Sequence, residues 1–195
     1  MESHHRYERA PNEVDAIAAG LIKQHYKDTL GELKPKIDFC FVRAPRDEAG
    51  NPKGPALTRH GKPAAGEARV IKLKDRALGR GDLEVLLDGD MWPTLDHPQK
   101  VALVDHELYH FNAKRKPGTD ESGPLGFDFD DLDRPLFQLR EHDFECGWFV
   151  EIAKRHGPAS FEVQQAVAFR QNHGQLFFDF NIAIQQPELK AAVGM

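Results

Sequence analysis

Apolar positions near the start of the chain recur at helical spacing. Val14, Ile17 and Leu21 fall about one turn apart, as they would on one face of a helix. This helix would span residues 12–28, and Pro11 stands just before it, where proline is common. The first expected element is therefore an amphipathic helix that buries one face.

The pattern then changes to short apolar runs that suit strands. Three strands are expected, over residues 37–42, 69–74 and 83–88. Residues 44–66 are rich in glycine, proline and charge, which predicts a long loop between the first two strands. The strands would form a small sheet, and an extended peptide could pair along its edge.

The strongest helix signal begins at Asp96. Asp96 and Gln99 have the spacing of a capping box, and Pro98 falls in the first turn, where its missing N–H does little harm. The helix would run to about Phe111 or Asn112. Its apolar side would be formed by four residues: Val101, Val104, Leu108 and Phe111.

The opposite side of this helix carries the candidate chemistry. His106, Glu107 and His110 form the motif H-E-x-x-H. Residues four apart lie on one helix face, so both imidazoles can reach a single Zn²⁺ ion. Glu107 falls at the edge of that face, which suits a general base acting on a metal-bound water.

A catalytic zinc normally takes three protein ligands, so a third must come from elsewhere. A second helix is expected over residues 140–156. His142 ranks first on it as the third ligand. Glu145, one turn further on, is the alternative ligand or an acceptor for an imidazole N–H. Two neighbouring acids, Glu141 and Asp143, are weaker candidates.

The remaining chain predicts another helix over about residues 159–172, and an apolar stretch over 176–184 that fits a strand or a packed tail. The length favours a single domain over residues 1–195. Its core would span residues 6–157, and residues 158–195 would form a C-terminal helical extension.

Composition narrows the class of protein. Of the 195 residues, 40% are apolar and 29% are charged, which is typical of a globular chain. No apolar run approaches the length of about 18 residues that a membrane span needs. The first residues lack the layout of a signal peptide. Two cysteines far apart predict neither a disulfide scaffold nor a cysteine-based zinc site, so we expect a cytoplasmic protein.

Basic residues concentrate in one stretch although the net charge is −5. Residues 51–80 hold eight of them: Lys53, Arg59, Lys62, Arg69, Lys72, Lys74, Arg76 and Arg80. Such a stretch can follow the phosphates of DNA, but a run of charge is more often a solvated surface. The sequence therefore supports DNA only weakly as a partner.

Four segments carry a family resemblance: Tyr7–Pro11, Val104–His110, His142–Glu145 and Arg155–Gly157. Over about residues 6–157 the chain resembles a family of phage and prophage metallopeptidases. That family is similar to the Spartan-like zincins, in which a histidine on a later helix completes a three-histidine site. The resemblance implies His142 as the third ligand, Glu107 as the base, and a bacterial or phage-infected host cell as the location.

The expected architecture is α+β and zincin-like. A small twisted sheet would pack against the H-E-x-x-H helix and a second ligand-bearing helix. The expected function is zinc-dependent hydrolysis of peptide bonds in a protein or peptide substrate, by a water that Glu107 activates. The alternatives are a DNA-associated protease of the Spartan type and a non-catalytic binding module stabilised by zinc. The sequence does not indicate an oligomeric state.

Overall fold

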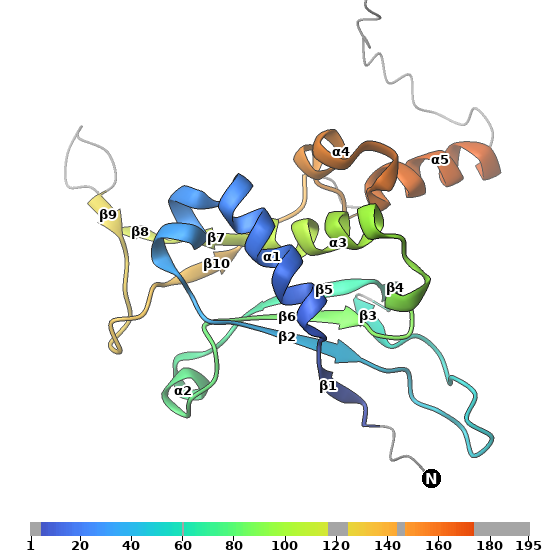
Figure 1. Cartoon of the computed structure of the whole chain (residues 1–195), viewed down its shortest axis with the longest axis horizontal. Helices are drawn as coiled ribbons and strands as arrows, with labels where there is room; N and C mark the ends of the chain where they lie inside the picture. Colours follow the sequence, from blue (N-terminus) through green and yellow to red (C-terminus); the bar gives the residue numbers. More distant parts are fainter. Residues whose placement is uncertain (1–4, 60, 117–124, 144–146, 174–195) are drawn as a thin grey trace, which may run out of the picture.

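The structure is a computed structural model of the whole chain, and it describes residues 5–59, 61–116, 125–143 and 147–173. A four-stranded mixed sheet lies at its centre (Figure 1). In spatial order its strands are β1 (Tyr7–Arg9), β2 (Ile37–Val42), β6 (Leu83–Asp88) and β5 (Gly66–Val70). β2 and β6 run parallel, whereas the two outer pairs are antiparallel. The strand β5 is therefore at one edge of the sheet.

Two helices pack against one face of this sheet (Figure 1). They are α1 (Asn12–His25) and α3 (His97–Tyr109). The main core joins the two helices to one side of β2 and β6, and it includes Val14, Leu21, Phe39, Val85, Leu87, Val104 and Leu108. The helix expected over residues 12–28 ends three residues early, because a short π-helix, η1 (Lys27–Gly31), follows α1.

The other face of the sheet carries a smaller apolar cluster. It consists of Val42, Leu57 and Leu86, with Cys40 and Ala64 packed against them. Leu57 and Ala64 belong to a hairpin of β3 (Leu57–Arg59) and β4 (Lys62–Ala64). The expectation of an irregular loop over residues 44–66 was therefore wrong for this part, since the hairpin is ordered by burying Leu57.

The second of the three expected strands is displaced from its expected position. Residues 69–74 were expected to form it, but β5 spans Gly66–Val70 and a short helix, α2 (Leu73–Ala77), follows. The partner strand sets these limits, because Val70 pairs with Leu83, the first residue of β6. The alternation of apolar and polar residues predicted that a strand is present. Its ends depend on pairing with β6, which is distant along the chain.

Shorter elements complete the described chain. They are η2 (Trp92–Thr94), β7 (Phe111–Ala113), β8 (Arg115–Lys116), β9 (Leu125–Phe127), β10 (Phe137–Leu139), α4 (Val150–His156), η3 (Gly157–Ala159) and α5 (Phe161–His173). β7 pairs antiparallel with β10, and β8 pairs with β9. α4 and α5 lie beside α3 (Figure 1). The helix expected over residues 159–172 is confirmed as α5.

The long helix expected over residues 140–156 was wrong. Among the residues of this stretch that the structure describes, only Val150–His156 are helical, as α4. The Asp143 carboxylate accepts a hydrogen bond from the backbone N–H of Val150 at 2.8 Å, which starts the helix there. Gly147 has a φ of +84°, a left-handed conformation that interrupts a helix. His142 therefore lies on an irregular segment between β10 and α4.

The architecture is α+β, with a small mixed sheet and several helices. Among the helices of the described residues, none combines the length and the apolar character that crossing a membrane would require. Glu145 and the apolar stretch 176–184 lie outside the described residues.

Candidate metal centre

The helix α3 is held in place by interactions that its own sequence encodes. The Asp96 carboxylate accepts from the backbone N–H of Gln99 at 2.8 Å, and the Gln99 side chain accepts from the N–H of Asp96 at 2.9 Å. The predicted capping box is thus confirmed. Val104 and Leu108 are fully buried in the main core. The helix therefore presents His106 and His110 from an anchored element.

Three imidazoles converge at the end of α3. The ring centroids of His106 and His110 lie 5.2 Å apart. His142 approaches them from its irregular segment, with its centroid 5.3 Å from His106 and 4.6 Å from His110. One candidate ligand atom from each histidine lies within 4.8 Å of the other two. The geometry is that of a group able to hold a metal ion.

An aromatic ring supports all three imidazoles. Phe149 is fully buried, and its centroid lies 5.0 Å from that of His106, 4.8 Å from His110 and 4.6 Å from His142. Edge and tilted contacts at these distances favour fixed ring orientations. Phe149 directly precedes α4, so the start of α4 positions the ring beneath the imidazoles.

Two of the imidazoles have their outer nitrogen engaged. His106 Nδ1 lies 2.7 Å from the Glu162 carboxylate, and His110 Nδ1 lies 3.0 Å from the carbonyl oxygen of Arg140. Both partners are acceptors, so each Nδ1 carries the proton and donates it. In the neutral form of each ring, Nε2 then keeps its lone pair. His142 Nε2 faces His106 Nε2 at 3.3 Å.

The protein environment changes the proton affinity of these rings. Burial lowers the pKa of His110 to about 3 and that of His142 to about 4, and the neighbouring His106 adds to both effects. Burial also disfavours the charged form of His106, but the hydrogen bond to Glu162 and the negative charges of Glu107 and Glu162 together outweigh it and raise the pKa of His106. His110 and His142 are therefore neutral near pH 7, the state in which imidazole binds metals.

Glu107 is buried beside the histidines, with 3% of its surface exposed. Its Oε2 has no hydrogen-bond partner among the described residues. Burial raises the pKa of Glu107 to about 7, although the positive charges of His106 and Arg59 oppose the rise. A buried carboxyl group with a free oxygen can exchange a proton near neutral pH, as a general base must.

Glu107 fits only because the facing strand residue has no side chain. Gly66 is the first residue of β5, and a Cβ built on it would lie 2.8 Å from the Glu107 carboxyl carbon and closer still to Oε1. That distance is well inside ordinary van der Waals contact. The edge strand of the sheet and the Glu107 carboxylate are therefore immediate neighbours.

A buried polar network fixes the far side of α3. Asp105 is fully buried and accepts hydrogen bonds from Tyr26, from Arg155 at 3.2 Å and from His156 at 2.7 Å. Burial favours the neutral acid, but the bonds from His156 and Tyr26 outweigh it and lower the pKa of Asp105. The network joins the end of α1 and the end of α4 to the residue next to His106.

The structure brings the three predicted histidine ligands together: His106, His110 and His142. The predicted base, Glu107, follows His106 on α3. The two weaker candidates, Glu141 and Asp143, are exposed. The Asp143 carboxylate accepts a hydrogen bond from the backbone N–H of Val150. The sequence did not single out Gly66, Phe149 and Glu162. None of the three has a local signal, because each acquires its position through contacts that are distant along the chain.

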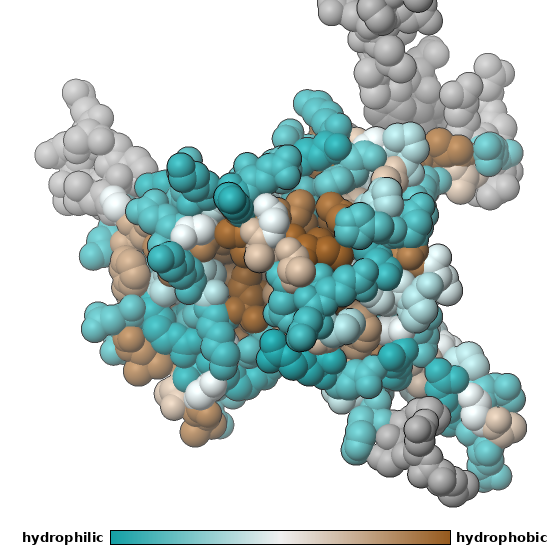
Figure 2. All heavy atoms as spheres, viewed as in Figure 1, coloured by the Kyte–Doolittle hydropathy of each residue, from teal (hydrophilic) through white to brown (hydrophobic). Residues whose placement is uncertain are grey.

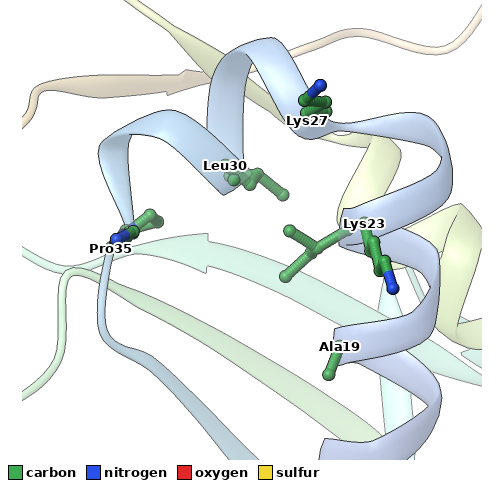
Figure 3. A pocket seen from close by; sticks show the side chains of 8 residues that line it. Ala19, Lys23, Lys27, Leu30 and Pro35 are labelled. Atoms are coloured by element: carbon green, nitrogen blue, oxygen red, sulfur yellow. The ribbon is translucent and has the colours of Figure 1, made fainter.

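A separate hollow of about 460 Å³ opens between α1, η1 and the following segment (Figure 3). Figure 2 shows apolar side chains gathered in this region amid a hydrophilic surface. Its lining residues are Ala19, Ile22, Lys23, Lys27, Leu30, Gly31, Lys34 and Pro35. None of these is an acid, a histidine or a cysteine, so the hollow lacks side chains that commonly bind metals.

A family model described as "Putative phage metallopeptidase" matches residues 5–169 of the chain. The chain belongs to this family. No curated protein and no solved structure matches it. The residues matched to the phage metallopeptidase model include the three histidines, Glu107 and the first nine residues of α5. Membership and the three-histidine group agree that this region can bind a metal.

Proposed function

We propose that this member of the phage metallopeptidase family is a zincin-like, zinc-dependent peptidase. His106, His110 and His142 would hold the metal, and Glu107 would be the base. The observation that carries the proposal is the convergence of three imidazoles beside a buried carboxyl group that has a free oxygen. A structural zinc usually has four protein ligands and needs no base, so this set favours a catalytic metal.

The donor set fits zinc in particular. Neutral imidazole nitrogens suit Zn²⁺, which bonds to them at about 2.0–2.1 Å in tetrahedral geometry. Two nitrogens at tetrahedral corners around such an ion are about 3.3–3.4 Å apart. The separation of the His106 and His142 Nε2 atoms is 3.3 Å. Three protein ligands leave one position for water or substrate.

The chemistry divides between the metal and Glu107. Zinc would supply Lewis acidity, which polarises a carbonyl and makes a water more acidic. Glu107 Oε2 would accept the proton of the attacking water and then deliver it to the leaving amine. The raised pKa of Glu107, caused by burial, suits both transfers near neutral pH. Arg59, whose charge acts on Glu107, is a candidate to attract negative charge that develops on the substrate.

The substrate would be an extended protein or peptide segment. β5 is the edge strand of the four-stranded sheet, and its Gly66 adjoins Glu107. A peptide that paired with β5 would run past this carboxylate, and such pairing is a common mode of peptide recognition. The main chain of β5 would then supply affinity without a requirement for one side-chain sequence.

Glu107→Gln tests the proposed function most directly. The zinc-loaded variant should keep about one zinc per chain but lose about 100- to 10,000-fold in peptide hydrolysis, because the base is removed and the ligands are not. Metal content is measured by elemental analysis, and hydrolysis by mass spectrometry of a peptide library. Glu32→Gln, an exposed change of the same charge, is the control. Equal hydrolysis by Glu107→Gln and the wild type would exclude Glu107 as the base.

The two alternatives predict different results in the same preparation. A non-catalytic zinc module would bind zinc and cleave no library peptide. A DNA-associated protease would bind DNA with an affinity that falls steeply as salt rises. Three of the eight basic residues of the stretch 51–80 are paired with acids of the protein: Arg69, Arg76 and Arg80. This pairing reduces the charge available for phosphates.

A further inference from the structure

We propose that Glu162 is a positioning residue for the metal centre, acting through His106. Its carboxylate would hold the ring with Nδ1 protonated and Nε2 directed at the metal, which makes α5 part of the site. The inference rests on the proposed three-histidine metal site and adds to it a residue that does not touch the metal. The contact is between α5 and α3, at Glu162 Oε1 and His106 Nδ1, 2.7 Å apart.

Position 162 is buried, and a carboxylate at such a position usually has a structural or functional role. Only 3% of its surface is exposed, and acids are seldom buried to this extent without a partner. The imidazole of His106 is the side-chain partner. A hydrogen bond with a charged acceptor at this distance is stronger than a neutral one and directional. The ring of His106 is thus held at a defined angle.

Glu162 lies where a negative charge is favoured. It stands in the first turn of α5, where the helix dipole stabilises an acid. Its Oε1 lies 2.7 Å from His106 Nδ1, so the carboxylate can act as the acceptor for that ring.

The two acceptors behind the imidazoles are not equivalent. His110 donates to a neutral carbonyl oxygen, that of Arg140, whereas His106 donates to a carboxylate. An anionic acceptor makes the opposite nitrogen more basic and therefore a stronger ligand. Loss of such an outer partner typically costs 10- to 100-fold in metal affinity. We expect a loss of this size when Glu162 becomes neutral.

Zinc affinity of the full chain is the decisive measurement, by competition with a chromophoric chelator. Glu162→Gln should bind zinc about 10- to 100-fold more weakly than the wild type. Glu32→Gln, which removes an exposed acid, should match the wild type. In a His106→Ala background, Glu162→Gln should add no further loss, because its effect passes through His106. An equal loss in both backgrounds would overturn the proposal.

Nitrogen NMR of the metal-free protein gives a second readout that does not depend on zinc or on any variant's folding. At a pH above the pKa of His106, where its ring is neutral, the wild type should show the Nδ1–H tautomer; the Nε2–H tautomer would overturn the proposal. A wild type that binds no zinc but shows the Nδ1–H tautomer would refute the metal site and leave the contact standing. A wild type that binds zinc with the same affinity as Glu162→Gln would refute only the role of Glu162.

Discussion

At the scale of single residues, the environment of Glu107 depends on the absence of a side chain at Gly66. The carboxylate occupies the space that a side chain at position 66 would fill. Its Oε2 is buried without a partner among the described residues, a cost of roughly 1–3 kcal/mol for a polar group. Such a cost is common where a group must stay free to react. Glycine at position 66 and acid at position 107 therefore act as a pair.

Gly66→Ala tests this pairing. The new methyl group would displace the Glu107 carboxylate, which is a flexible side-chain end, so the fold and the zinc content should persist. Peptide hydrolysis should fall by about 100-fold, the usual effect of a shift of about 1 Å in a reacting group. Rates and zinc content are measured on the same sample.

Gly20→Ala provides the matched control. It makes the same change within α1, where a Cβ would meet nothing within 4 Å. Its hydrolysis rate should equal that of the wild type, and its helix should gain up to about 1 kcal/mol. Full activity in Gly66→Ala would show that the position of the carboxylate is not set by β5.

At the scale of elements, the contrast between α3 and α4 shows what the sequence can predict. The start of α3 follows from a capping box within four residues, and this prediction was confirmed. The expected end at Phe111 or Asn112 was wrong, because α3 ends at Tyr109 and Phe111 is the first residue of β7. The start of α4 depends on the Asp143 side chain and on a left-handed Gly147. His142, Cys146, Phe149 and Ala153 recur at helical spacing across both residues, and this spacing wrongly predicted one long helix.

Asp96→Ala measures how much the cap contributes to the stability of α3. Removing the side-chain acceptor leaves the Gln99 N–H without a partner, so the free energy of unfolding should fall by about 0.5–2 kcal/mol. Urea unfolding followed by circular dichroism gives this value. Asp96→Asn keeps a good cap and should lose much less. Equal losses in the two variants would show that charge, not capping, is what matters.

The candidate site was predictable where its residues are close in sequence. His106, Glu107 and His110 follow from one turn of one helix, and the structure keeps them on it. His142 was identified because a third ligand was needed, although it lies outside α4, the described helical part of the segment expected to carry it. Gly66 and Glu162 could not be found, because their roles depend on β5 and α5 packing against α3.

At the scale of the whole molecule, α3 is held from both sides at adjacent residues. Asp105 faces Tyr26, Arg155 and His156, whereas His106 faces the other histidines and Glu162. The helix thereby connects α1, α4 and α5. The ligands from α3 and from the segment of His142 come together only in the folded chain, so a metal that they hold would bind only the folded state. Metal binding should therefore stabilise the whole molecule.

Zinc should raise the melting temperature of the protein. A ligand that binds only the folded state contributes about 4 kcal/mol at 1,000 times its Kd, or roughly 8–16 °C for a chain of this size. Differential scanning calorimetry with and without zinc, and after chelation, measures the shift. His142→Ala should lose most of the shift. His25→Ala, at the end of α1, should keep it. A shift that persists in His142→Ala would place the metal elsewhere.

The pairing of β7 with β10 has a consequence for how a metal would be received. The ladder brings Leu139 opposite Phe111, so Arg140 and His110 meet directly beyond its end, where the Arg140 N–H donates to the His110 carbonyl oxygen at 2.6 Å. The pairing of β7 with β10 thus brings the segment of His142 back to α3. The conformational entropy of this loop closure is lost when the chain folds, before any metal binds. Zinc would therefore bind a preformed site, whereas a zinc finger folds only when its metal binds. Chelation would then empty the site without dismantling the architecture around it.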